Sequence, residues 1–407
     1  MRFLLTYLLV VVTALLGPIT PLAFAEDTSK LSADVLSGES AILIDATTGQ
    51  VLFEKNPHEK LYPASITKIA TGIYAIEKGN PDDIVTVSKK ARYEEGTRVY
   101  LGEGEQVPLR KLEYGLLMHS GNDAATAIAE HMHQTTERFA EELNAYLSEK
   151  VGVTETHFAN AHGLHDPNHY TTASDMAKIA KYAMQNPIFR EIVGTVRLPW
   201  DGKEWKSELV NHNKLLRNYE GATGIKNGFT DQAMQTLVGS AKRGNTEFIA
   251  VTLKASTSAN AYKDVTSMLD YGFANFETKP IAAKGKAYTH AAAPGNDAVI
   301  TYTTMDDLYA TVPKGTEPLV ELTEDGHLLV QGGDLHITYP LLRQDPPPVA
   351  SEPRRAQLAK SLEDHSGVLY GLLFVWLAMN LFMISYTVRR TRRMRRVRNR
   401  DWQRRAY

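Results

Sequence analysis

The feature of this sequence that most restricts how the chain can fold is an uncharged apolar stretch near the C-terminus, at residues 367–388. A helix rises about 1.5 Å per residue, so this stretch is long enough to cross the hydrocarbon layer of a membrane. Ten arginines and one acidic residue follow, and arginines concentrate on the cytoplasmic side of membranes. A buried core helix is the alternative, and the arginines argue against it. We therefore predict a single membrane-spanning helix at 367–388, a cytoplasmic tail at 389–407 and a body outside the cytoplasmic membrane.

The N-terminus has the pattern of a secretory signal peptide. Arg2 precedes an apolar run at residues 3–16, and the small residues of Ala-Phe-Ala end at position 25. This pattern predicts a signal peptide of residues 1–25 that is cleaved after Ala25. A retained membrane anchor is the alternative, but the run is short and is interrupted by glycine and proline within residues 17–21.

The charge of the segment between the two ends excludes one class of partner. The whole chain has a formal net charge of -2, but residues 26–367 carry 46 acidic and 34 basic residues, a net charge near −12. An acidic surface repels phosphate groups, so we expect no nucleic-acid partner. The arginine-rich tail alone can attract nucleic acid, but its place after the apolar stretch favours a role at the membrane. The absence of cysteine excludes disulfides, thiolate catalysis and cysteine-ligated metals.

The order of the expected strands and helices indicates an α+β fold. Residues 41–55 form two β-prone runs around a Thr-Thr-Gly turn, and residues 235–256 form a second expected hairpin that turns at Arg243-Gly244-Asn245. Helical periodicity dominates between them, with expected helix starts at Ser65, Leu109, Asn122, Glu137 and Ser174. Strands at both ends of a helical block predict an antiparallel sheet whose helices come mainly from the middle of the chain.

The composition after this region suggests further segments. Residues 279–345 contain short β-prone runs between glycine, proline and acidic turns, which we interpret as a small β-rich domain behind a larger α+β domain at 26–278. Residues 346–366 combine prolines with polar residues and lack an apolar period, which is typical of a semi-rigid linker.

A serine and a lysine three residues apart are the first candidate site. The sequence SITK at residues 65–68 stands at an expected helix start, and this spacing puts Ser65 and Lys68 on one face of a helix. A serine hydroxyl becomes a good nucleophile only when a base takes its proton, and a lysine can do so if its pKa is lowered. The alternative interpretation is a capping serine with a solvated lysine, because this pair of residues is common.

Two further motifs favour the interpretation of Ser65 and Lys68 as a nucleophile and its base. HSGND at residues 119–123 and GIKNGFT at residues 224–230 follow in that order, the second just before an expected strand pair. With these three elements the chain resembles the low-molecular-weight penicillin-binding proteins that act as D-alanyl-D-alanine carboxypeptidases (serine peptidase family S11), within the serine β-lactamase and transpeptidase superfamily. Residues 139–183 resemble the helix, loop and helix of those enzymes, and the likeness extends over about residues 37–276. The resemblance implies a β-lactamase/transpeptidase-like fold.

The resemblance implies a role for each motif residue. Ser65 is expected to be the acylated nucleophile, Lys68 its proton acceptor, and Ser120 a relay of protons toward the leaving D-alanine. The expected substrate-binding residues are Asn122, Lys226, Asn227, Gly228, Phe229 and Thr230. Main-chain N–H groups of Ser65 and Phe229 are expected to form the oxyanion hole.

The third motif departs from the Lys-Thr-Gly that is usual in the family. Asn227 stands where a threonine normally offers a hydroxyl, and its amide NH2 is the alternative donor. Many relatives also carry an arginine after the last hairpin, where this chain has only Lys263. The groups that bind the substrate carboxylate are therefore the least defined part of the expected site.

Other polar clusters have plainer interpretations. His162, His165, Asp166 and His169 invite a metal site, but their spacing is not that of helical ligands, so we expect structural loop residues, no metal and no cofactor. The acidic pairs Asp45 with Glu54 and Glu94 with Glu95 are interpreted as exposed charge on strands and loops.

These expectations combine into one function and two alternatives. The chain is expected to remove the terminal D-alanine from peptidoglycan stem peptides through an acyl-enzyme, with β-lactam antibiotics as covalent inhibitors. A β-lactamase is the first alternative, but Ala140 stands where class A enzymes place a deacylating glutamate before Asn144. A non-catalytic wall-binding scaffold is the second, and the intact motifs oppose it.

Overall fold

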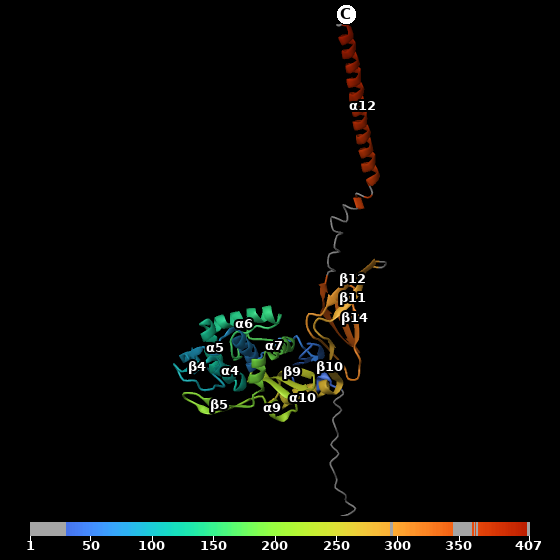
Figure 1. Ribbon diagram of the computed structural model, residues 1–407. Coiled ribbons are helices and arrows are strands. Elements are labelled where there is room, and N and C mark those ends of the chain that lie inside the picture. The colour runs from blue at the N-terminus through green and yellow to red at the C-terminus, as the bar shows by residue number, and fades with distance from the viewer. Residues whose placement is uncertain (1–29, 294–295, 345–359, 362, 364, 405–407) are drawn as a thin grey trace, which may run out of the picture. The chain divides into compact units, whose positions relative to one another are not determined.

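The computed structural model describes residues 30–293, 296–344, 360–361, 363 and 365–404. The predicted signal peptide and most of the predicted linker lie outside these residues. The chain divides into two compact units (Figure 1). One comprises the residues up to Tyr288 together with Thr303–Leu342, and the other comprises Thr289–Tyr302 and the residues from Arg343 onward.

A five-stranded antiparallel sheet forms the centre of the first unit. Its strand order is β2-β1-β9-β8-β7, and it joins the two ends of the predicted catalytic region because β1 pairs with β9. Both predicted hairpins are confirmed, one as β1 with β2 and the other as β8 with β9. The strands are β1 (Ser40–Asp45), β2 (Val51–Lys55), β7 (Ala222–Thr230), β8 (Met234–Arg243) and β9 (Thr246–Ala255).

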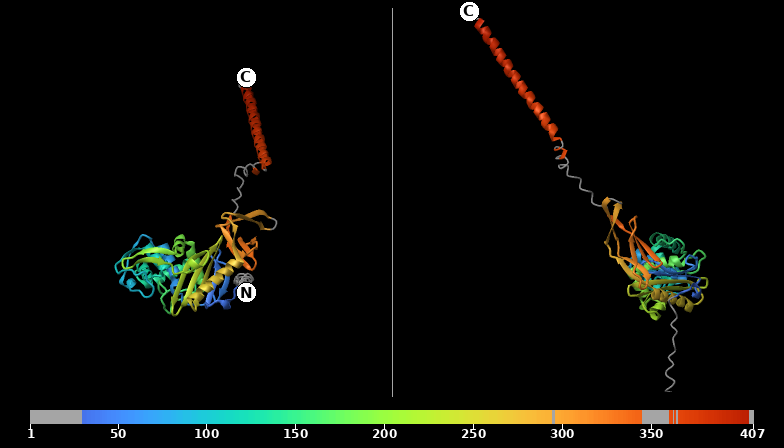
Figure 2. Two further views of the ribbon diagram at one scale, coloured as in Figure 1. Left: turned by 90° about the horizontal axis from the view of Figure 1, so that it is seen from below. Right: turned by 90° about the vertical axis from the view of Figure 1, so that its right-hand side faces the viewer.

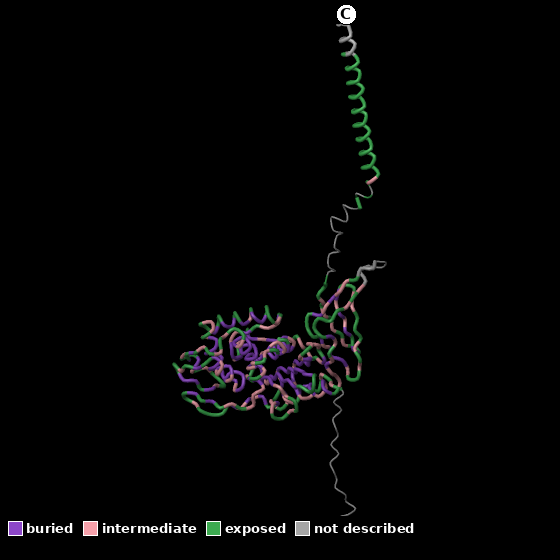
Figure 3. Tube along the Cα trace, viewed as in Figure 1, coloured by how far each residue is buried: buried purple, intermediate pink, exposed green. Residues whose placement is uncertain are grey.

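The alternation of side chains along β1 divides the interior into two cores. Ile42 and Ile44 pack into the larger core with the helices of the middle region, whereas Ala41 and Leu43 face the opposite side of the sheet. There α10 (Ser258–Asn275) covers the sheet and supplies the second core (Figure 2). The sheet is therefore buried between two helical layers, and Figure 3 shows the buried residues concentrated along these elements.

The helices of the middle region begin close to the predicted positions. Four predicted starts are confirmed to within one residue, and Ser65 lies in a 3-10 turn, Ala64–Thr67, that leads directly into α2. Threonine side chains cap α6 and α7 by accepting hydrogen bonds from main-chain N–H groups, which explains where these helices begin. The helices are α2 (Lys68–Lys78), α3 (Lys89–Arg92), α4 (Leu109–Met118), α5 (Asn122–His133), α6 (Thr136–Lys150), α7 (Ala173–Gln185), α8 (Pro187–Gly194) and α9 (Leu215–Asn218).

Short strand pairs complete the two units. In the first unit, β3 (Ile84–Thr86) pairs with β4 (Gln106–Pro108), and β5 (Arg197–Asp201) pairs with β6 (Lys206–Val210). After α10 the described chain is β-rich, as predicted, while the predicted domain boundaries stay predictions. The strands there are β10 (Phe276–Ala282), β11 (Ala287–Ala293), β12 (Asn296–Thr303), β13 (Leu308–Pro313), β14 (Leu319–Leu322), β15 (His327–Gly332), β16 (Leu335–Pro340) and β17 (Leu342–Gln344).

Asp45, at the end of β1, corrects one sequence-based expectation. It was expected to be exposed, but its side chain is fully buried. Its carboxylate accepts hydrogen bonds from the main-chain N–H groups of Thr47 and Thr48, at 2.7 and 2.8 Å, and from the hydroxyl of Thr278. Thr278 lies in β10, more than 200 residues away in sequence, so local patterning around Asp45 cannot reveal this burial.

The apolar stretch near the C-terminus forms part of one long helix, α12 (Ser366–Arg404). Among the described residues, its segment Ser366–Arg396 is the one helix that is long and apolar enough to cross a membrane. In the most apolar stretch of 18 residues within that segment, no residue is buried by the rest of the protein. The helix continues past the apolar stretch into the arginine-rich tail.

Candidate active site

The first motif places Ser65 and Lys68 in contact. Ala64 has a left-handed conformation (φ 50°), which is costly for a residue with a side chain and sets the direction of the turn that carries Ser65. One turn later, the Nζ atom of Lys68 lies 3.1 Å from the Oγ atom of Ser65. The Lys68 side chain is fully buried, so the interpretation of a solvated lysine is wrong.

Two carbonyl oxygens hold the Lys68 amine from the side away from solvent. Nζ donates to Oδ1 of Asn122 at 2.7 Å and to the main-chain oxygen of His162 at 2.6 Å. Both acceptors come from segments far from Lys68 in sequence. The role of the His162 carbonyl was missed by sequence reasoning, because a main-chain oxygen leaves no signature in the sequence.

Burial and a second cation favour the uncharged form of Lys68. Burial lowers its pKa well below the ordinary value, and the nearby charge of Lys226 lowers it further. The carboxylates of Asp123 and Glu94 act in the opposite direction and raise it. Burial also lowers the pKa of Lys226 to about 7.

The second motif lies at the junction between α4 and α5. Ser120 is almost fully buried and left-handed (φ 65°), and its hydroxyl makes no hydrogen bond within the described residues. Asn122 is the first residue of α5, and its amide Nδ2 donates to the main-chain oxygen of Glu95 at 2.6 Å. The carboxylate of Asp123 accepts from the main-chain N–H groups of Val99 and Leu101, which fixes the preceding loop beside this junction.

The third motif is the strand β7, which runs past Ser65. A Cβ atom at Gly228 would lie 2.7 Å from the main-chain nitrogen of Ser65, so only glycine allows this approach. Lys226 is buried and donates to the main-chain oxygen of Asn227 at 2.8 Å. Phe229 is 56% exposed, and the hydroxyl of Thr230 accepts from the main-chain N–H of Ala233. The structure thus brings the third motif to Ser65.

Asn227 faces a pocket that sequence reasoning did not identify. Its Oδ1 atom is buried without a hydrogen-bond partner among the described residues. The pocket has a volume of about 400 Å³ and contains two cationic side chains, Lys214 and Arg217. Lys263 is not among its lining residues, so the cations beside Asn227 come from the segment before β7. The other lining residues are His119, Glu208, Val210, Asn211, His212, Ser258 and Tyr262.

The histidine loop has a structural role around the nucleophile. His169 Nε2 lies 2.8 Å from the hydroxyl of Thr67, and its Nδ1 accepts from the main-chain N–H of Ala159. The ring of His165 packs edge to face against the ring of Tyr62, with 4.7 Å between the ring centroids. Within the described residues, no group of three or more histidine, aspartate or glutamate side chains is placed to hold a metal ion.

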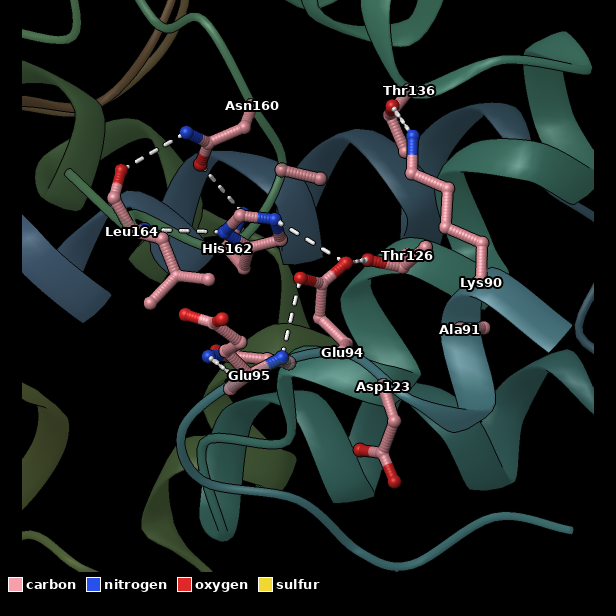
Figure 4. A network of polar contacts seen from close by, with 12 residues as sticks. Lys90, Ala91, Glu94, Glu95, Asp123, Thr126, Thr136, Asn160, His162 and Leu164 are labelled. Atoms are coloured by element: carbon pink, nitrogen blue, oxygen red, sulfur yellow. Dashed lines mark hydrogen bonds and ion pairs between the residues drawn. The ribbon is translucent and has the colours of Figure 1, made fainter. Parts of the chain in front are cut away.

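Glu94 is not the exposed charge that was expected. Its side chain is only 15% exposed and lies between His162 and Thr126 (Figure 4). The Thr126 hydroxyl donates to Oε2 of Glu94 at 2.7 Å, and Nε2 of His162 lies 3.7 Å from the same oxygen. Glu95 is exposed, as expected.

Comparisons with known proteins show the family of this chain. Residues 27–257 match the family described as D-alanyl-D-alanine carboxypeptidase. D-alanyl-D-alanine carboxypeptidase DacF of Bacillus subtilis (strain 168) is 35% identical over 308 residues, which cover 73% of this chain and 78% of that protein. DacD of Escherichia coli (strain K12) is 32% identical over 297 residues, 69% of this chain and 75% of that protein.

A solved structure extends the likeness to the fold. Penicillin binding protein 5 from Haemophilus influenzae superposes with a TM-score of 0.68 at 26% identity, covering 78% of this chain and 100% of that chain. The predicted α+β fold of the β-lactamase/transpeptidase type is confirmed. The chain belongs to the D-alanyl-D-alanine carboxypeptidase family of serine peptidases.

Proposed function

We propose that this serine-type D-alanyl-D-alanine carboxypeptidase uses Ser65 as its nucleophile and Lys68 as the base that activates it. The observation that supports this most strongly is the set of contacts around Lys68 Nζ. The two shorter contacts, to Asn122 and His162, are to carbonyl oxygens, which can only accept hydrogen bonds. An uncharged amine has two N–H groups and one lone pair. When Lys68 is uncharged and the carbonyl oxygens hold both of its N–H groups, the lone pair is left for the third contact, the Ser65 hydroxyl at 3.1 Å.

The reaction follows from this arrangement. Ser65 Oγ attacks the carbonyl carbon between the last two D-alanines, and its proton moves to Lys68 Nζ. The C–N bond then breaks, and the leaving amine takes a proton, which we propose Ser120 relays from Lys68. Water next attacks the carbonyl carbon of the acyl-enzyme and loses a proton to Lys68 Nζ. The bond between this carbon and Ser65 Oγ then breaks, and Lys68 returns the proton to Oγ. Free D-alanine and the shortened stem peptide are the products.

We propose that main-chain N–H groups of Ser65 and Phe229 bind the oxygen that becomes negative during attack. Gly228, between them in space, supports this assignment, because a side chain there would collide with the Ser65 nitrogen. Preorganised donors of this kind stabilise the transition state rather than the substrate.

The remaining motif residues are proposed to bind the peptide. Asn122 would hold the peptide backbone, and Lys226 would attract the terminal carboxylate. Asn227 lines the pocket and its Oδ1 atom has no hydrogen-bond partner among the described residues, which supports a role for its amide in binding the peptide. Thr230 would offer its hydroxyl near the same carboxylate.

The ends of the chain suggest where the enzyme works. The apolar helix Ser366–Arg396 fits membrane anchoring. We propose cleavage of the signal peptide after Ala25, a single membrane crossing by the C-terminal helix and a catalytic domain on the outer side facing peptidoglycan. A chain truncated before residue 366 should leave the membrane fraction on carbonate extraction, whereas the full chain should remain in it.

The function is tested by incubating the detergent-solubilised full chain with a peptide that ends in D-alanyl-D-alanine and measuring free D-alanine. We expect release by the wild type, loss of release in Ser65→Ala, and unchanged release in Ser207→Ala, a matched change at an exposed serine on β6. Labelling by a fluorescent penicillin should follow the same order. Equal release or labelling in Ser65→Ala and wild type would disprove the nucleophile assignment.

A further inference from the structure

The two carbonyl oxygens that hold the Lys68 amine are both connected to one short turn, residues 94–97. The amide Nδ2 of Asn122 donates to the main-chain oxygen of Glu95 at 2.6 Å, and the main-chain N–H of Asn122 donates to the main-chain oxygen of Thr97 at 2.7 Å. Gly96 has φ 78° and approaches this amide so closely that a Cβ atom would lie 2.8 Å from Nδ2. The turn therefore fixes the orientation of the Asn122 side chain, and so the position of its Oδ1.

The second acceptor is connected to the same turn through the His162 ring. Nδ1 of His162 accepts from the main-chain N–H of Leu164 at 3.1 Å, so the ring carries its proton on Nε2. Burial lowers the pKa of His162 to about 3, which keeps the ring neutral near neutral pH. The Nε2–H group faces Oε2 of Glu94, which the Thr126 hydroxyl holds in place (Figure 4).

The loop that carries His162 is rigid, so its ring and its carbonyl move together. Oδ1 of Asn160 accepts from the main-chain N–H of Gly163 at 2.7 Å, and its Nδ2 donates to the oxygen of Leu164 at 3.0 Å. Gly163 has φ 87°, and a Cβ atom there would lie 1.9 Å from the main-chain oxygen of Ala64. A change in the position of the His162 ring therefore also changes the position of the His162 main-chain oxygen that Lys68 contacts.

We propose that Glu94 is a positioning residue for Lys68: through His162, its carboxylate fixes one acceptor of the Lys68 amine and places a negative charge behind it. The role rests on the proposed function, because it concerns the base that activates Ser65. Glu94 does not touch the substrate site itself. Its neighbour Glu95 contributes main-chain groups alone: its oxygen accepts from Asn122, and its N–H donates to Oε1 of Glu94 at 3.3 Å.

The charges around Lys68 give the effect of Glu94 a definite sign. Lys226 on β7 lowers the pKa of Lys68, whereas Asp123 on α5 and Glu94 raise it. The nearby rings of His162, His169 and His212 all have pKa values lowered to about 3 by burial, so they carry no charge at neutral pH. Lys90 on α3 lowers the pKa of His162, and its amine donates to the hydroxyl of Thr136 at 2.6 Å (Figure 4). Removing the Glu94 charge therefore favours the uncharged amine.

The test is the pH dependence of acylation, measured on the detergent-solubilised full chain with a fluorescent penicillin. The rate should fall on the acid side as Lys68 becomes protonated. In Glu94→Gln we expect this acid limb to move to lower pH by roughly half to one pH unit, because an opposite charge near a titrating group shifts its pKa by that order. We also expect a several-fold lower plateau rate, because the acceptor is held less firmly.

Three further variants separate charge from position. Glu95→Gln makes the same change in net charge at the exposed neighbour and should leave the profile of the wild type unchanged. Thr126→Val keeps the Glu94 charge but removes the hydroxyl that holds it, so the plateau should fall without a matching shift of the limb. Glu94→Asp keeps the charge and should return the limb toward its position in the wild type.

The possible results distinguish this role from the proposed function. An acid limb in Glu94→Gln that coincides with that of Glu95→Gln, or that moves to higher pH, overturns the role of Glu94 alone. A wild type that is not acylated at any pH overturns the proposed function and this role together. Thermal melting of each variant shows whether a lower plateau reflects unfolding, and the position of the limb is independent of the active fraction.

Discussion

Replacing Gly228 by alanine tests how closely β7 approaches the main chain of the nucleophile. The added Cβ atom would lie 2.7 Å from the nitrogen of Ser65, 3.1 Å from that of Ile66 and 2.6 Å from the hydroxyl of Thr236. The hydroxyl can rotate away, although it would lose its hydrogen bond to the main-chain oxygen of Pro63. The nitrogen of Ser65 cannot move without moving the nucleophile.

The expected loss of rate in Gly228→Ala depends on how far Ser65 and β7 must move apart. Ordinary contact begins at 3.4 Å, so Ser65 and β7 must separate by about 0.7 Å, or the methyl group will cover the proposed oxyanion donor. Loss of one such donor costs roughly 10²- to 10³-fold in rate, or about 3–4 kcal/mol of transition-state stabilisation. Overpacking costs about 1–3 kcal/mol in the free energy of unfolding.

Two measurements separate these effects. The value of kcat/KM for D-alanine release should fall by roughly 10²- to 10³-fold in Gly228→Ala, while a denaturant titration reports the change in stability. Adding Thr236→Ala removes the 2.6 Å contact but not the 2.7 Å contact, so it should restore stability more than rate. Gly194→Ala is the matched control, because its new Cβ atom would meet only an oxygen at 3.4 Å.

A kcat/KM of Gly228→Ala within about threefold of the wild type, well short of the loss expected for an oxyanion donor, would contradict the proposed effect on Ser65. Equal recovery of rate and stability in the double variant would contradict it as well. In that case the collision with Thr236, rather than the approach to Ser65, would have caused the loss.

Three other predictions concern stability and pH dependence. Asp45→Ala should lower the free energy of unfolding by about 2–4 kcal/mol, because it leaves the N–H groups of Thr47 and Thr48 and the buried hydroxyl of Thr278 without their acceptor. Glu54→Ala, on the exposed face of the same hairpin, should change the free energy of unfolding by less than about 0.5 kcal/mol in a urea titration. Because burial lowers the pKa of Lys226 to about 7, its positive charge is lost as the pH rises through that value, and kcat/KM for peptides should decline above about pH 7. Lys226→Arg should move this decline to higher pH, since an arginine stays charged. A decline at the same pH in Lys226→Arg would contradict the assignment of the decline to Lys226. Gly163→Ala should abolish acylation and lower the melting temperature, since its Cβ atom would lie 1.9 Å from a main-chain oxygen; normal penicillin labelling of this variant would be incompatible with the described loop.

The sequence alone determined the local structure and the order of the motifs. Two β-prone apolar runs around a turn predict each hairpin of the sheet, because strand and turn preferences are properties of the local chain. The helix starts follow from apolar periodicity, which is local in the same way. The uncharged stretch at 367–388 and the arginines after it predict the terminal helix, since the length and charge of a membrane-crossing segment are properties of the segment itself.

Only the tertiary structure decided which groups surround these motifs. The spacing of Ser65 and Lys68 puts them on one face of a helix, but it does not show that Lys68 is buried. The carbonyl of His162 reaches Lys68 across 94 positions of sequence, and a main-chain oxygen is common to every residue, so no pattern can identify it. Burial and the proximity of distant charges set the state of an ionisable side chain, and both arise from packing between segments. For the same reason Asp45 and Glu94 resemble surface charges in the sequence, and the folded chain places one against Thr278 of β10 and the other beside His162.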